Sequence, residues 1–396
     1  MDITAVTAYA VKADELYSMT GSVAAGETLP GSDYLRFGGY PQLYSAKSQA
    51  ALIRVETDAG LVGWGESQAP VGTEIILTIV KEVLAPAVLG RPAEATSLRY
   101  TDMYETMRVR GQIGGYQQDA IAGLDTALWD LRGRAANASI ADLLGGRRRD
   151  RLPAYVTGLR EKTPQGRRAE AADWAAQGLG VKPCLGLGAV SDGREVEGLR
   201  SAMGDDATLL VDGMWSYTYP EAIRAGRVFE QYGVGFLEAP LLPEDVRGHA
   251  RLAAELDLPI AVGEPLRTRY QFLPWFQAEA LDIAQPDLMR NGVTETTAIG
   301  ELAQAFNLPV ALHTGVTTVV GMAASWQVAS TMRTFHIQEL QPVMVTTFNP
   351  WIAEPLRIFD GAVEVPTGPG LGIEVDEERV RRMATDVVTL TLRDTA

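Results

Sequence analysis

The chain has 396 residues, of which 46% are hydrophobic and 21% charged, so length and composition indicate a globular protein of about two domains. A net charge of −15 and a pI of about 4.8 argue against nucleic acid as a partner, because phosphate binding needs a basic surface. The single cysteine, Cys184, excludes an internal disulfide and fits a reducing compartment. The acidic start of the chain does not resemble a secretory signal, and Lys81 and Glu82 interrupt the most apolar helical stretch. We therefore expect a cytoplasmic protein that neither binds nor spans a membrane.

The first part of the chain mixes strand and helix patterns and ends in a long helical stretch. The expected elements are a strand at residues 5–13, a hairpin at 50–67 that turns at 58–60, and helices at 74–89, 95–107 and 117–144. The last helix stops before the pair Gly145-Gly146, a helix-terminating signal. This pattern predicts an α+β domain over residues 1–125.

Eight short apolar segments follow, and most are separated by helical stretches. They read AYVTG, VKPCL, LLVD, GFLE, IAVGE, DIAQPD, PVALH and HIQEL. Alternation of strand and helix predicts a modified TIM barrel of the (β/α)7β type over residues 126–365. After Leu340 the segment QPVMVTTFNPWIAEP lacks helical periodicity, so the last helix is expected to be incomplete. The segment EVPTGPGLGIEVD is expected to form a strand and turn, with residues 366–396 returning to the first domain to complete a capping domain.

A charged residue closes each of the last six barrel segments at a nearly constant spacing. The residues are Asp212, Glu238, Glu264, Asp287, His313 and Glu339, separated by 26, 26, 23, 26 and 26 positions. One β/α unit has about this length. Because the C-terminal ends of barrel strands carry the active site, this pattern predicts a catalytic cluster.

Three of these residues are candidate metal ligands. Asp212, Glu238 and Glu264 end consecutive strands, so their carboxylates should converge, and without a cation they would repel one another. All-oxygen ligation suits Mg²⁺, with Mn²⁺ as a substitute, better than zinc.

A candidate base lies on the next two strands. His313 and Asp287 should be neighbours, and a carboxylate bonded to one imidazole nitrogen raises the basicity of the other. Lys182 and Cys184 share one face of the second strand, so Lys182 should point into the acidic mouth as a third catalytic group. Cys184 is interpreted as an inward packing residue that lines the site, and His249 as a surface residue.

At these residues the chain resembles the mandelate racemase group of the enolase superfamily. The resemblance includes GWGES, VDGMW, FLEAP, VGEP, QPDLMRNGV, the ALH strand and PGLGIEVD, and it covers nearly all of the chain. It implies that Asp212, Glu238 and Glu264 bind Mg²⁺ and that a protonated Glu339 donates a hydrogen bond to the substrate carboxylate. Tyr40 lies in the stretch from Tyr34 to Tyr44, which should cover the barrel mouth and contact the substrate.

One departure from this group decides the predicted reaction. The group often carries Lys-x-Lys on its second strand, whereas this chain reads Lys182-Pro183-Cys184 and lacks the second lysine. Racemisation normally needs a base on each face of the substrate, whereas β-elimination needs only one. We therefore expect an enzyme that dehydrates a sugar acid, a small-molecule substrate. We also expect it to be a homo-oligomer. The alternatives are a cycloisomerase, an epimerase or racemase, and a non-catalytic sugar-acid binder.

Overall fold

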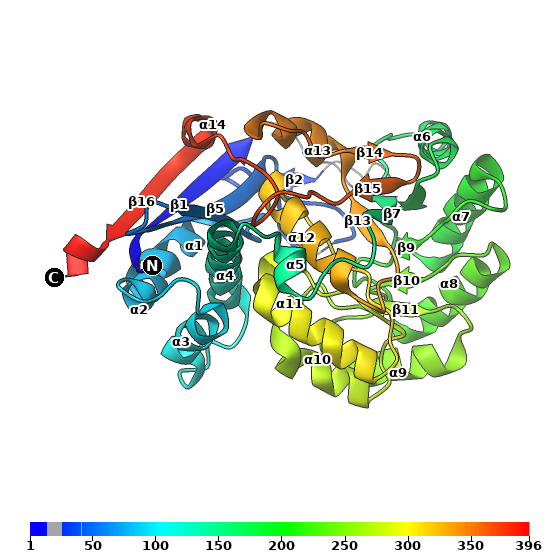
Figure 1. Cartoon of the computed structure of the whole chain (residues 1–396). Helices are drawn as coiled ribbons and strands as arrows, with labels where there is room; N and C mark the ends of the chain where they lie inside the picture. The colour runs from blue at the N-terminus through cyan, green and yellow to red at the C-terminus, as the bar shows by residue number, and fades with distance from the viewer. Residues whose placement is uncertain (14–25, 41, 396) are drawn as a thin grey trace.

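The computed structural model describes residues 1–13, 26–40 and 42–395 and contains two packed parts, a capping part and a barrel. Figure 1 shows both chain ends in the capping part, on the side away from the barrel helices α7 and α8. The predicted fold class, a modified TIM barrel with an α+β cap, is confirmed.

The capping part is built on a four-stranded antiparallel sheet with the order β16-β1-β5-β6. Its strands are β1 (Ile3–Ala13), β5 (Ser48–Thr57), β6 (Val62–Ser67) and β16 (Ala384–Thr391). The predicted hairpin is present, and its turn includes Gly60 at φ 74°, a backbone conformation that glycine adopts without strain. A small second sheet contains β2 (Glu27–Thr28), β3 (Tyr34–Arg36) and β4 (Tyr44–Ser45).

The helical segments of the capping part are α1 (Thr73–Ile79), the π-helical turn η1 (Val80–Leu84), α2 (Ala85–Val88), α3 (Thr96–Arg108), α4 (Gly115–Ala136) and α5 (Ile140–Leu143). Of these, α1, η1 and α4 pack on the four-stranded sheet. The stretch predicted as one helix at 117–144 is divided at Asn137, which has a left-handed φ of 51°. Helix α4 packs on both β6 and the barrel helix α11, so the boundary expected at residue 125 falls inside an element shared by both parts.

The barrel strands are short and parallel. They are β7 (Arg151–Thr157), β8 (Gly180–Lys182), β9 (Val211–Asp212), β10 (Leu237–Glu238), β11 (Ile260–Val262), β12 (Ile283–Ala284) and β13 (Gln338–Leu340). Isolated parallel bridges at Val310 and His313 supply the seventh strand position. The pairing of β13 with β7 closes the barrel.

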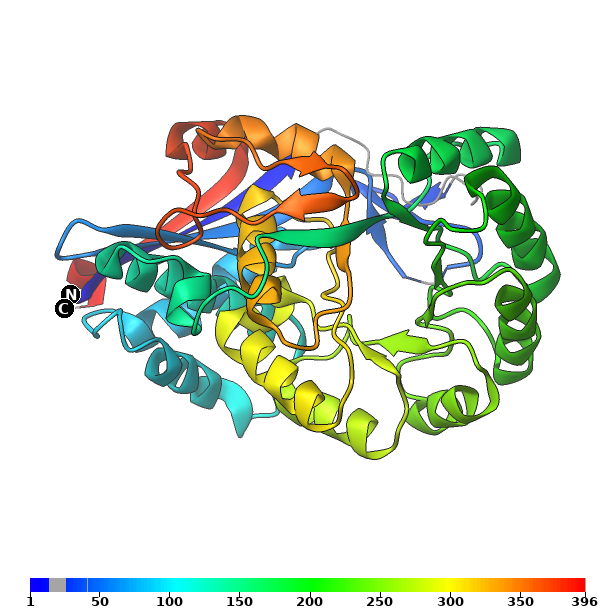
Figure 2. The ribbon, with the colours of Figure 1, turned by 45° about the vertical axis from the view of Figure 1, so that its right-hand side comes forward.

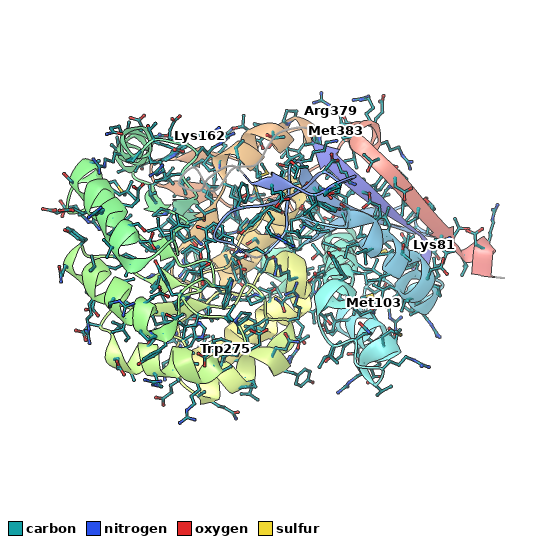
Figure 3. The ribbon with its side chains drawn as sticks, turned by 180° about the vertical axis from the view of Figure 1, so that it is seen from behind. Lys81, Met103, Lys162, Trp275, Arg379 and Met383 are labelled. Carbon is teal, nitrogen blue, oxygen red and sulfur yellow. The ribbon has the colours of Figure 1, made fainter. Side chains whose placement is uncertain are left out.

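Seven helices follow the first seven strand positions and surround the barrel (Figure 2). They are α6 (Pro164–Ala176), α7 (Ala189–Met203), α8 (Tyr219–Gln231), α9 (Val246–Glu255), α10 (Thr268–Gln277), α11 (Leu288–Ala305) and α12 (Val319–Thr331). Figure 3 shows the molecule from behind, with Met103 among the cap helices and Trp275 on α10. Among the described residues, no helix has the length and apolarity needed to cross a membrane.

The C-terminal region contains a short last helix and a return to the cap, and the structure corrects only the statement that the segment after Leu340 lacks helical periodicity. The segment after Leu340 does form a helix, α13 (Pro342–Phe348), followed by the 3-10 turn η2 (Asn349–Trp351). Met344, Val345 and Phe348 are buried at helical spacing, a short apolar pattern that is easily overlooked beside two threonines.

Residues 362–364 do not pair with the capping sheet, and the chain returns to the cap after them. Strand β15 (Ala362–Glu364) pairs with β14 (Ile358–Phe359) and with the N-terminal end of β7, not with the capping sheet. Helix α14 (Glu377–Met383) then leads to β16, which pairs with β1 and precedes the last turn, η3 (Leu392–Thr395).

Candidate active site

The charged residues that were predicted from the strand spacing lie at one end of the barrel. Asp212 and Glu238 are the last residues of β9 and β10, and Glu264 follows β11 by two positions. Asp287 and His313 are joined by a parallel bridge, and Glu339 lies in β13. Because the strands are parallel, this pattern directs these side chains toward one cavity.

His313 and Asp287 form the expected dyad. The Nδ1 atom of His313 is 2.7 Å from Oδ2 of Asp287, and its Nε2 atom is 2.9 Å from Oε2 of Glu264. The other carboxylate oxygen of Asp287 accepts the backbone N–H of Met289 at 2.8 Å, so the start of α11 fixes the orientation of this carboxylate. Burial disfavours the imidazolium, but Glu339, Glu264 and Asp287 together raise the pKa of His313 well above its usual value.

Three of the predicted groups supply ligand atoms close enough to share one metal ion. The atoms belong to Glu238, Glu264 and His313 and lie within 4.8 Å of one another. Asp212 lies on the wall of the same cavity, and its Oδ1 accepts the backbone N–H of Met214 at 2.7 Å. The predicted carboxylates are therefore neighbours, although His313 rather than Asp212 completes the tightest group.

The electrostatics of this group show an excess of buried negative charge. Burial, reinforced by Glu238 and only partly offset by Lys182, raises the pKa of Asp212 well above its usual value. Burial also raises the pKa of Glu238. For Glu264 burial acts in the same direction, but His313 outweighs it and lowers the pKa of this carboxyl. Such a cluster gains stability from a bound cation, and its oxygen donors suit a hard divalent ion.

Lys182 is held between two buried carboxylates. Its Nζ atom is 2.6 Å from Oε2 of Glu238 and 2.8 Å from Oε1 of Glu339, and the side chain is 1% exposed. Burial disfavours the ammonium, but Glu238 and Glu339 outweigh it and raise the pKa of Lys182 well above its usual value. A lysine held as a cation neutralises charge and is a poor base at neutral pH.

Glu339 connects the last strand to the segment that carries His313. Its Oε2 atom accepts the backbone N–H of Thr314 at 2.7 Å, while its Oε1 atom faces Lys182. The side chain is buried, and the residue lies on the cavity wall.

Two residues expected at the substrate lie behind the wall of the cavity. Cys184 is 2% exposed and packs with Tyr40 and Met214, and burial raises the pKa of its thiol well above the usual value. The hydroxyl of Tyr40 donates to the carbonyl of Leu185 at 2.6 Å, which uses its polar end within the protein. Neither Cys184 nor Tyr40 is among the lining residues of the cavity.

The cavity has a volume of about 270 Å³ and lies between the cap and the barrel mouth. The expected covering segment supplies Gln42, Leu43 and Tyr44, while Pro41 lies outside the described residues. Lys47 and Arg290 add positive charge to the wall, which suits an anionic substrate. Neither Lys47 nor Arg290 was identified from the sequence.

Three further residues, none of them predicted from the sequence, hold the carboxylates in place. Trp215 donates its indole N–H to Oε1 of Glu264 at 3.0 Å, and Arg290 donates to the Glu264 carbonyl at 2.8 Å. Gln285 donates to Oε2 of Glu238. Trp215 lies three residues after Asp212 in the VDGMW motif, and Arg290 lies three residues after Asp287 in the QPDLMR motif. This closeness in sequence is the signal from which both could have been predicted as site residues.

The surface position expected for His249 is wrong. This histidine is 0% exposed, and its ring lies 6.1 Å from that of Trp215 and 5.0 Å from that of Trp275. It occupies the inner face of α9, where Leu252 is also buried.

Family descriptions match both parts of the chain. The description "Enolase C-terminal domain-like" matches residues 167–379, more than half of the sequence, and the N-terminal domain of mandelate racemase/muconate lactonizing enzymes matches residues 44–145. The chain belongs to the enolase superfamily. Its two matched domains are those of the mandelate racemase/muconate lactonizing enzyme family, as the resemblance implied.

Curated relatives and solved structures agree with this assignment. The chain is 33% identical to the D-galactarolactone cycloisomerase of Agrobacterium fabrum over 83% of this chain and 89% of that protein. It is 31% identical to the arabinonate dehydratase of Saccharolobus solfataricus over 81% and 87%. A crystal structure of an enolase superfamily member from Agrobacterium tumefaciens superposes with a TM-score of 0.92 at 31% identity, covering 98% of this chain and 99% of that one.

Magnesium occurs within this structural group. A racemase from Streptomyces coelicolor with bound magnesium superposes with a TM-score of 0.83 at 25% identity, covering 97% of this chain and 100% of that chain.

Proposed function

We propose that this enzyme removes the proton α to the carboxylate of a sugar acid and then expels the β-hydroxyl, giving a 2-keto-3-deoxy acid. The observation that carries the proposal is the His313–Asp287 dyad, at 2.7 Å, whose histidine lies on the wall of a cavity that is also lined by carboxylates. Similarity to an arabinonate dehydratase supports the reaction type and the substrate class.

Asp212, Glu238 and Glu264 are the proposed ligands of Mg²⁺, with Mn²⁺ as a substitute. The donor set fits, because these carboxylates lie close together, with Asp212 and Glu238 buried and Glu264 partly exposed, and because the pKa values of Asp212 and Glu238 are raised. When bound, such an ion stabilises negative charge that develops on the substrate carboxylate as the α-proton leaves. Lys182 lies beside these ligands and is proposed to balance the charge of the substrate, while Glu339, in its protonated form, is proposed to donate a hydrogen bond to the substrate carboxylate.

His313 is the proposed base. Asp287 holds the imidazole through Nδ1, while Nε2 contacts Glu264, and both carboxylates raise the pKa of His313. Binding of Mg²⁺ by Glu264 would remove that partner and leave Nε2 as the nitrogen that takes the α-proton. The resulting imidazolium can return this proton to the departing hydroxyl on the same face, and water leaves as the C–O bond breaks. The enol that remains becomes the 2-keto acid. One base therefore serves both steps, which agrees with the buried position and raised pKa of Cys184 on the second strand.

A cycloisomerase is the second candidate, because the chain is 33% identical to a D-galactarolactone cycloisomerase. Ring opening by β-elimination uses the same first step and differs only in the leaving group. Racemisation or epimerisation is disfavoured by the lack of a second base, and the presence of the dyad argues against simple binding.

The test is a screen of acid sugars and their lactones for Mg²⁺-dependent formation of a 2-keto acid, repeated in D₂O with the best substrate. We expect one solvent deuterium at C3 of the product and an unchanged C2 configuration in recovered substrate. Accumulation of the C2 epimer would contradict single-base elimination and favour the epimerase alternative. A lactone that reacts while the open acids do not would assign the cycloisomerase activity.

A further inference from the structure

A glutamate of the capping sheet contacts the barrel segment that follows the proposed base in the chain. Glu66 lies on β6 and is 1% exposed, and its carboxylate accepts hydrogen bonds from barrel residues. The backbone N–H of Thr318 lies 2.9 Å from Oε1 and 3.1 Å from Oε2, and the Thr318 hydroxyl donates to Oε2 at 2.6 Å. The Thr317 hydroxyl donates to Oε1 at 2.9 Å, and the N–H of Gly321 donates to Oε2 at 2.9 Å.

These contacts close the N-terminus of α12. The first backbone N–H groups of a helix have no partner within the helix, and the helix dipole favours an anion beside them. Thr318 caps one of them itself, through Val320. Glu66 accepts two more, those of Thr318 and Gly321, from another part of the chain. Burial raises the pKa of Glu66, and the hydrogen bonds from its donors offset this only in part. These hydrogen bonds therefore stabilise the ionised form of the carboxyl.

The same contacts determine the position of the His313 loop (residues 313–318), which joins the seventh strand position to α12. Glu339 holds one end through the N–H of Thr314, and Glu66 holds the other end through Thr317 and Thr318. Between them, a side chain on Gly315 would lie 2.3 Å from Nε2 of Gln68, two residues beyond Glu66. The end of β6 therefore packs tightly against the loop that carries the proposed base.

We propose that Glu66 is a positioning residue through which the cap sets the placement of His313. The inference rests on the proposed function for its catalytic consequence, but its structural part, anchoring of the His313 loop by Glu66, can be tested separately. A displacement of about 1 Å at a reacting group can lower a rate by about 100-fold. Loss of the anchor should therefore affect turnover more than substrate binding.

The test compares Glu66→Gln with Asp125→Asn. Both substitutions replace a buried carboxylate that accepts a backbone N–H and a threonine hydroxyl across the contact between cap and barrel. Asp125 accepts them from Thr294 on α11 and does not contact the His313 loop. We expect Glu66→Gln to lower kcat by about 10- to 100-fold, with KM and Mg²⁺ affinity near those of the wild type. Asp125→Asn should leave all three unchanged.

Backbone hydrogen exchange supplies a readout independent of activity. In Glu66→Gln the amides of residues 314–321 should exchange faster than in the wild type, whereas in Asp125→Asn they should not. Thr317→Val removes one donor without changing the carboxylate and should accelerate exchange in the same segment to a smaller degree. This variant keeps the proposal testable if Glu66→Gln does not fold.

Two results would overturn the proposal. One is wild-type exchange in residues 314–321 of Glu66→Gln, or of Thr317→Val if that variant alone folds. The other is a loss of kcat in Glu66→Gln that Asp125→Asn reproduces, because the effect would then be general destabilisation. If no sugar acid reacts with the wild type, the proposed function fails while the exchange comparison still decides the anchor.

Discussion

Asp125 should make the stability of the protein fall as the pH rises toward neutrality. The carboxyl is 0% exposed on α4 and accepts the backbone N–H of Thr294 at 2.9 Å and its hydroxyl at 2.6 Å. Burial outweighs these hydrogen bonds and raises the pKa of Asp125 from 3.8 to about 7. The folded state therefore binds a proton that the unfolded chain has already released between these two values.

The sign and size of the effect follow from this difference. Because the folded pKa is the higher one, the free energy of unfolding is largest below the unfolded value and decreases as the pH rises toward about 7. While the folded carboxyl keeps its proton and the unfolded one does not, a tenfold fall in proton concentration costs the folded state about 1.4 kcal/mol. Because the folded carboxyl is half ionised near pH 7, the interval from pH 5 to pH 7 corresponds to about 2 kcal/mol, and that from pH 5 to pH 8 to about 3 kcal/mol.

Asp125→Asn keeps the shape of the neutral acid and removes the titration. Urea unfolding at fixed ionic strength should show the variant gaining about 3 kcal/mol on the wild type between pH 5 and pH 8. Asp142→Asn is the matched control, because hydrogen bonds from Ser139 lower the pKa of Asp142 and keep it ionised throughout this window. Its difference from the wild type should be the same at every pH. An equally constant difference for Asp125→Asn would refute the reasoning.

Three further outcomes concern the active site. Removal of metal by a chelator should abolish activity, and added Mg²⁺ should restore it. The Asp212→Ala variant should bind Mg²⁺ weakly in calorimetry. An active, metal-free Asp212→Ala variant would contradict the ligand assignment. His313→Asn should lose about 10²–10⁴-fold in kcat, whereas Cys184→Ser should retain most activity, and the reverse ranking would move the base to the second strand. Lys182→Met should slow turnover and unfold at lower urea, because it leaves Glu238 and Glu339 without their cation, but the C2 configuration of recovered substrate should not change.

The strand-end residues could be predicted because the barrel repeats one unit of nearly constant length. A functional residue that ends one strand has a counterpart about one unit later, so Asp212, Glu238 and Glu264 could be found without any structure. The dyad follows from the same rule, since parallel neighbours in register bring Asp287 and His313 together.

The remaining features depend on contacts between distant segments, which no local pattern records. The inner position of His249 results from packing between Trp215 and Trp275, although a histidine at that point of a helix is equally compatible with the surface. Side-chain alternation predicted that Cys184 would face inward, but not that Met214 and Tyr40 would cover it. Helix α13 was missed because seven residues contain too few turns for periodicity to be recognised.

The contact between cap and barrel is made specific by buried carboxylates as well as by apolar packing. Glu66 and Asp125 accept backbone N–H groups from barrel segments, and Asp130 accepts those of Trp64 in the cap and Leu371 in the C-terminal segment at 2.9 Å each. Apolar surfaces tolerate small shifts, but a buried carboxylate that loses its donors costs several kcal/mol. Glu66 and Asp125 therefore hold β6 and α4 against separate barrel segments, and Asp130 joins α4 to β6 and to the C-terminal segment. Since Gln68 follows β6 and lines the cavity, the contacts of Glu66 are the ones that place this part of the cap relative to His313.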